Sequence, residues 1–292
     1  MVAVLAHGAG EVPVSRLAHA WSAPASILVG AVVLLVLFLQ AWMRLRRRGR
    51  ADHAGWDRLA LFLAALALGS LALVSPLDAV GEDYLISAHM LQHVLIGDAA
   101  PALALVALRG PLLFFLLPPV VLGPVARLRW LRRGLAALVR PKPALAIWIV
   151  VFALWHVPRV YDFVLTRPLV HDLEHLLFVV AGILVWTQLV DPARRRELSV
   201  ARRLLVAACL FAAGTVLSYV LIFTLHPLYP AYAAQDTRLW GISPRLDQQL
   251  AGLVMMVEQT LTLGTCAFLL LRGRLRRGVA IEEREHALPR VL

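Results

Sequence analysis

The sequence predicts an all-α, polytopic integral membrane protein with seven transmembrane helices, its N-terminus outside and its C-terminus in the cytoplasm. Hydrophobic residues make up 60% of the 292 residues, charged residues only 16%, and the mean hydropathy is +0.76, which is far outside the range of soluble domains. The apolar residues form runs of about the twenty residues needed to cross a bilayer. Basic residues collect in alternate loops between these runs, as the positive-inside rule expects.

The net charge of +11 raises the question of nucleic-acid binding. However, the basic residues fall in blocks between apolar runs and have no aromatic or glycine-rich partners, so membrane topology explains them better. We therefore expect contact with a lipid bilayer and none with nucleic acid. The two cysteines, Cys209 and Cys266, lie in separate spans without a CxxC spacing and are expected to be packing residues.

The first half of the chain is expected to contain an outer segment and three spans. Residues 1–23 lack the basic region of a secretory signal, so they are interpreted as a short outer segment. The first span, Pro24–Met43, ends in a run of arginines that marks its cytoplasmic end. The second, Leu59–Ser75, leads to an acidic outer loop. The third, Tyr84–Leu108, returns inward, and Pro101 should kink it and free backbone carbonyl groups.

The second half begins with the longest loop, residues 109–142, which carries seven basic residues. Prolines interrupt its apolar middle, so this loop is expected to be interfacial or re-entrant. The remaining four spans are expected at Pro143 to His156 or Val157, His171 to Val190, Leu204 to Leu225 and Leu246 to Leu271. Residues 24–272 would then form a single membrane domain, followed by a cytoplasmic tail at 273–292.

The positions of the basic residues test this topology. All but five of the 29 lysines and arginines fall in the segments expected to be cytoplasmic. The five outer ones are Arg16, Arg159, Arg167, Arg238 and Arg245. This asymmetry supports an outer N-terminus and a cytoplasmic C-terminus.

Two pairs of histidines with the same spacing lie inside apolar segments. His89 and His93 belong to the third span, and His171 and His175 begin the fifth, with Glu174 beside them. Residues four apart share one face of a helix, and both pairs lie in the outer half of their spans. Burying four imidazoles and a carboxylate in lipid is costly unless they pair or bind something. The pattern therefore predicts a functional site.

Three function classes are compatible with these residues. A copper-handling protein would use imidazole and thioether ligands, since thioether favours Cu(I). Met90 adjoins the first histidine pair, and Met255 lies in the last span. An intramembrane zinc metalloprotease would use His171, Glu174 and His175, which match the H-x-x-E-H pattern of two zinc ligands and an adjacent general base. A haem protein would use axial histidines from facing helices. The residues alone leave these alternatives open.

A series of motifs along the chain resembles one known family. The motifs are His89 to His93 followed by Pro101, Trp155-His156 with Pro158 and Tyr161, His171 to His175 with Trp186, and Asp247-Gln248-Gln249 with Ala251-Gly252. Their order and spacing resemble the polytopic CtaG-type cytochrome c oxidase assembly factors. The resemblance implies a multi-pass protein of the bacterial plasma (inner) membrane, not an enzyme, that supports copper delivery to a haem-copper oxidase. The partners it implies are oxidase subunits and a periplasmic copper chaperone.

Residue chemistry and resemblance together give a hypothesis for the site, in which copper is the metal and zinc or haem the alternatives. The expected ligands are His89, Met90, His93, His156, His171 and His175. The residues expected to support them or to admit the metal are Glu174, Asp98, His226, Asp247, Gln248 and Met255. Asp98 departs from the family's apolar pattern at its position and is interpreted as a polar contact, a proton-linked group or a partner of another helix.

Overall fold

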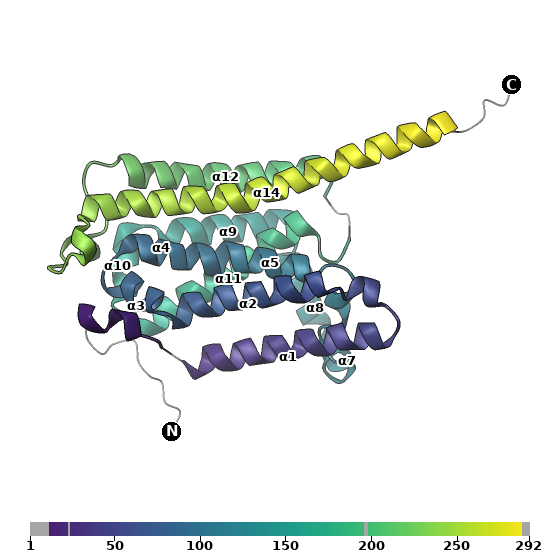
Figure 1. Ribbon diagram of the computed structural model, residues 1–292, viewed down its shortest axis with the longest axis horizontal. Coiled ribbons are helices and arrows are strands. Elements are labelled where there is room, and N and C mark those ends of the chain that lie inside the picture. Colours follow the sequence, from purple (N-terminus) through teal and green to yellow (C-terminus); the bar gives the residue numbers. More distant parts are fainter. Residues whose placement is uncertain (1–11, 23, 196–197, 288–292) are drawn as a thin grey trace.

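The computed structural model describes residues 12–22, 24–195 and 198–287, with the backbone alone for 277–287. All regular structure in these residues is helical. Figure 1 shows the long helices lying side by side with roughly parallel axes, as a bundle. The predicted all-α class is therefore confirmed.

Six segments are long and apolar enough to cross a membrane. They are α1 (Ala25–Arg47), α2 (Trp56–Val74), the segment from α4 (Ile86–Val94) to α5 (Ala100–Ala107), α11 (Pro168–Val190), α12 (Val200–Phe223) and α14 (Pro244–Ala287). A seventh results if α8 (Arg129–Leu138) and α9 (Pro141–Trp155), which meet at a 71° bend, form one broken span. The predicted fourth span corresponds to α9, whose 15 residues are fewer than a straight crossing needs.

The third span is interrupted by a π-helical turn, η3 (Leu95–Ala99). Pro101, the second residue after this turn, has no N–H to donate to the carbonyl of Gly97, four residues earlier. The predicted irregularity at Pro101 therefore takes the form of this turn. Gly182 of α11 packs against it so closely that an added Cβ would overlap the Gly97 carbonyl oxygen and lie 2.9 Å from its carbon. Two glycines thus let α11 and η3 touch backbone to backbone.

The third span and α11 form the interior of the bundle. In the most apolar stretch of each segment, 50% of the residues of the third span and 56% of those of α11 are buried. The corresponding share is 17% for α1, α2 and α14. On its other sides α4 packs against α14 and α3 (Pro76–Asp83), while α11 also packs against α9. Side chains on the facing surfaces of α4 and α11 are therefore shielded from lipid and from water.

Short helices cover the two ends of the bundle. We call one end the histidine end; it carries α3, α10 (Pro158–Leu165), α13 (Pro230–Ala233) and η1 (Val14–His19). The N-terminal segment contacts this end, since the Val12 N–H donates to Asp83 at 2.9 Å. Residues 109–142 form α6 (Pro111–Phe115), α7 (Pro119–Arg127) and α8, none of them long enough to span a membrane alone.

Candidate metal centre

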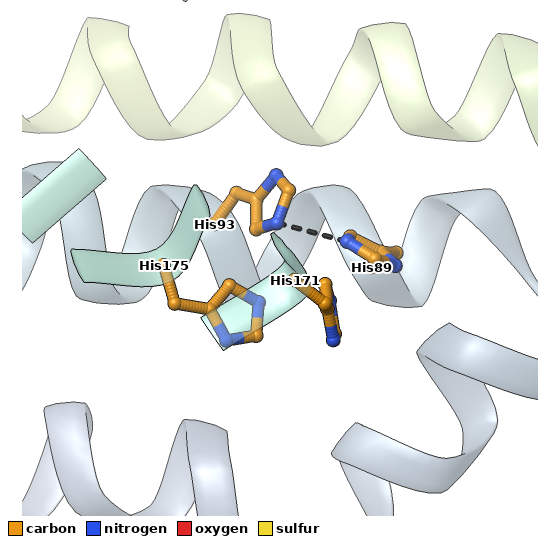
Figure 2. A group of neighbouring side chains, drawn as sticks. All are labelled: His89, His93, His171 and His175. Atoms are coloured by element: carbon orange, nitrogen blue, oxygen red, sulfur yellow. Dashed lines mark hydrogen bonds between the residues drawn. The ribbon is translucent and has the colours of Figure 1, made fainter. Parts of the chain in front are cut away.

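Four histidines meet inside the bundle near the histidine end. His89 and His93 of α4 and His171 and His175 of α11 each offer one nitrogen atom, and these four atoms lie within 4.8 Å of one another. Figure 2 shows the two pairs facing each other between the helices. Each side chain is at most 8% exposed. Within the described part of the chain, this is the one group of three or more His, Cys, Asp or Glu side chains close enough to hold a single ion.

The helical spacing of the histidines produces this geometry. Residues four apart stack one turn above the other, so the ring centroids lie 4.3 Å apart in the α4 pair and 4.2 Å apart in the α11 pair. Across the interface, His93 and His175 are 5.2 Å apart. The Nε2 atoms of His89 and His93 form a hydrogen bond of 2.8 Å, drawn as the dashed line in Figure 2. Two ligand atoms therefore already converge on one point.

The outer nitrogens of two rings are held by groups from the histidine end. His171 Nδ1 lies 2.9 Å from a carboxylate oxygen of Glu82. His89 Nδ1 lies 3.2 Å from the hydroxyl of Tyr232, which itself donates to the Gly81 carbonyl at 2.7 Å. Burial raises the pKa of Tyr232 well above its ordinary value, so this hydroxyl keeps its proton. Such partners fix the tautomer of a metal-binding histidine and direct its other nitrogen toward the ion.

Glu174 lies beside the histidines. Its side chain is 1% exposed, and its Oε1 atom lies 3.9 Å from His93 Nε2. A carboxylate at this distance attracts a positive charge placed among the imidazoles. Glu174 therefore lies beside the group of four histidines.

Asp247 and Gln248 stabilise the helices around the centre. The Asp247 carboxylate accepts hydrogen bonds from the backbone N–H groups of Ile86 at 2.8 Å and Ser87 at 3.0 Å. It thus caps the N-terminus of α4, the helix that carries His89 and His93. Gln248 accepts from the Leu228 N–H at 2.6 Å and donates to the Leu221 carbonyl at 3.1 Å. It thereby ties the end of α12 to the following loop.

The other predicted residues lie outside the group of four. Met90 and Met255 belong to a common buried apolar cluster with several tyrosines. The His156 Nδ1 atom hydrogen-bonds the Phe152 carbonyl at 2.7 Å, at the end of α9. His226 is exposed in the loop after α12, and Asp98 lies in η3. Of the six predicted ligands, the structure brings four histidines together.

Glu82 and Tyr232 were not among the predicted site residues. Glu82 belongs to an acidic loop that precedes the first histidine pair, but only the packing of α3 on α4 explains its contact with a ring from α11. Tyr232 comes from a loop 143 residues after His89. The only feature of the sequence that pointed to Tyr232 was the abundance of tyrosine in that loop. This abundance does not indicate which side chain a given tyrosine contacts.

The fold and the buried histidines define a polytopic membrane protein with an intramembrane candidate metal centre. Comparison with protein families then shows that the chain belongs to the cytochrome c oxidase caa3 assembly factors (Caa3_CtaG), whose profile matches residues 36–277. The matched region includes all four histidines. None of the curated proteins and none of the solved structures matches the chain. The predicted family is confirmed, and the chain is a membrane-embedded oxidase assembly factor.

Proposed function

We propose that the chain binds copper at the four-histidine centre and supports its delivery to a haem-copper cytochrome c oxidase during assembly. The observation that carries this proposal is the convergence of four imidazole nitrogens inside the membrane domain of an oxidase assembly factor. Neutral imidazole is a good ligand for copper. Burying four imidazoles in a membrane domain is costly, and such intramembrane polar groups mark functional positions.

The donor set suits copper as a cargo. The centre offers imidazole and no thiolate, since Cys266 and the exposed Cys209 are not part of it. Thiolates are the softer ligands and select Cu(I) strongly. A centre of imidazoles alone therefore holds copper less tightly than a thiolate site and releases it more readily, as transfer requires.

The direction of transfer follows from the charge asymmetry of the loops. We propose that the histidine end faces the outer side of the bacterial inner membrane, with the N-terminus outside and the C-terminus in the cytoplasm. Copper would then arrive from a periplasmic copper chaperone. It would leave to an oxidase subunit that docks against the bundle within the membrane.

The geometry supports zinc proteolysis and haem binding less well. Catalytic zinc keeps an open position for water beside three protein ligands, whereas here four imidazoles gather within 4.8 Å. A haem needs a pocket of several hundred Å³, whereas the cavity beside His93 has a volume of about 80 Å³. The proposed role is therefore metal handling without catalysis.

Oxidase activity in cells tests the proposal. His89→Ala and His171→Ala variants should lose oxidase activity in membranes at low copper and recover part of it when copper is added to the medium. His53→Ala is the matched control, because His53 lies between α1 and α2 and pairs with Asp52, and should support normal activity. Immunoblots establish equal protein levels. Full activity in both ligand variants, or a loss that copper never restores, would contradict copper supply.

A further inference from the structure

A second buried polar group lies deeper in the bundle, between η3 and α14. Asp98 and Glu258 line the same cavity, and their carboxyl groups lie within hydrogen-bonding reach of each other. At about 1.5 Å per residue, Asp98 lies roughly 18 Å along its span from Ile86, and Glu258 roughly 21 Å along α14 from Pro244. Both residues are therefore near the middle of a hydrocarbon core about 30 Å thick. Carboxyl groups at this depth are costly, and they mark functional positions in membrane proteins.

The contacts of the two carboxyl groups indicate that the pair holds a proton. A carboxylate only accepts hydrogen bonds, so a hydrogen bond between two carboxyl groups contains a proton from one of them. Both oxygens of Asp98 already accept, one from the Trp186 indole N–H and the other from the Thr262 hydroxyl at 3.0 Å. Glu258 is therefore the member that carries the proton and donates it to Asp98.

The irregular backbone of the third span places Asp98 in this position. Asp98 follows Gly97, whose close contact with Gly182 fixes η3 against α11. Trp186 lies one turn beyond Gly182 on α11, which brings its indole to Asp98. π-helical turns within α-helices occur frequently at functional sites. The same backbone contact thus positions both the pair and the helix that carries His171 and His175.

A cavity connects the pair with His93, one of the four clustered histidines, and with His156. It has a volume of about 80 Å³, and its polar lining includes Asp98, Glu258, His93 and His156. Three atoms of these lining side chains have no hydrogen-bond partner among the described residues: Glu258 Oε1, His93 Nδ1 and His156 Nε2. Water takes about 30 Å³ per molecule and needs two to four polar partners in a buried site. The cavity therefore has room and polar groups for two or three water molecules.

We infer that Asp98 and Glu258 form an intramembrane proton-binding site that exchanges its proton with water in this cavity. The pair holds one proton and one negative charge. In each exchange the Glu258 O–H bond breaks as its proton passes to a cavity water, and that water network returns another proton to the pair. The net charge of the pair is unchanged.

A proton fits this pair better than a metal ion. Among the described residues, no third His, Cys, Asp or Glu ligand atom lies close enough to the pair to complete a metal site. The other titratable groups around it are His93 of α4, His156 of α9 and Cys266 of α14. If copper binds as proposed above, the single negative charge of the pair also attracts the cation across the cavity.

Infrared spectroscopy of the metal-free full-length protein in lipid tests the inference without depending on copper. The wild type should show a carboxylic acid C=O band that shifts when H₂O is replaced by D₂O. Glu258→Gln should lose this band, because the amide N–H donates to Asp98 without an added proton. Asp247→Asn is the matched control, since it replaces another buried carboxyl, one that accepts three hydrogen bonds as a carboxylate does, and it should keep the band.

A second variant keeps the test decisive if Glu258→Gln fails to fold. The exchanged pair Asp98→Glu/Glu258→Asp retains two carboxyl groups and should retain a D₂O-sensitive band. A band that survives Glu258→Gln, or is missing from the exchanged pair, would show that the pair holds no proton. A band that does not shift in D₂O would show a sealed structural pair and overturn the exchange.

Discussion

Gly182→Ala should loosen the contact that holds α11 against the third span. The added Cβ would overlap the Gly97 carbonyl oxygen and lie 2.9 Å from the Gly97 carbon and 3.2 Å from Pro101 Cγ. Carbon atoms normally pack about 3.5–4.0 Å apart, so the two backbones must separate by about 0.6 Å or more. Overpacking of this kind costs about 1–3 kcal/mol. His175 lies two turns away on α11, so copper affinity should also fall, by about tenfold or 1.4 kcal/mol.

Thermal unfolding in detergent and competition with a Cu(I) chelator measure both effects. Gly264→Ala is the matched control, because a Cβ there meets no atom within 4 Å. Alanine is favoured over glycine in a helix by up to about 1 kcal/mol, so this variant should be as stable as the wild type or more stable. If Gly182→Ala unfolds and binds copper like Gly264→Ala, the backbone contact does not position the centre, and the reasoning fails.

Three further predictions concern the surroundings of the centre. Glu82→Gln should weaken copper binding about 10- to 100-fold, the usual effect of losing a partner that orients a ligand. Asp162→Asn, on α10, is the control and should leave the copper affinity unchanged. Equal Kd values for the wild type and both variants would disprove a role for Glu82. Asp247→Ala removes the cap of α4 and should lower the free energy of unfolding by about 0.5–2 kcal/mol, and an unchanged Tm would show that the cap is dispensable. Copper at 100 times its Kd should stabilise the wild type by about 2.7 kcal/mol, and the same shift in His89→Ala would place the copper elsewhere.

Local periodicity explains what the sequence could predict about this site. The pairing of His89 with His93 and of His171 with His175 needs only the 3.6-residue repeat of a helix. The apolar runs likewise predict the long helices, and six of them are present. The fourth span was predicted as a short one. In the structure a bend divides this part of the chain into α8 and α9, which form one span only if they are taken together.

Tertiary packing determines the features that sequence patterns did not reveal. That the two histidine pairs face each other depends on η3 and α5, the continuation of α4, packing against α11, which Gly97, Pro101 and Gly182 permit. Asp247 was expected to support the ligands or to admit the metal, and its contact with the N-terminus of α4 could not be predicted, because the sequence does not show which helix a carboxylate at a span end will meet. His156 was an expected ligand, and the end of α9 places it at the cavity beside His93 instead of in the group of four.

The central claim is that copper binds at the four histidines, and copper content together with X-ray absorption of the loaded protein tests it most directly. Wild-type protein incubated with Cu(I) and then dialysed should retain about one copper per chain, coordinated by imidazole nitrogen. The His89→Ala/His171→Ala double variant should retain none, and His53→Ala should match the wild type. Copper that stays bound to the double variant, or that is coordinated mainly by sulfur, would contradict the account.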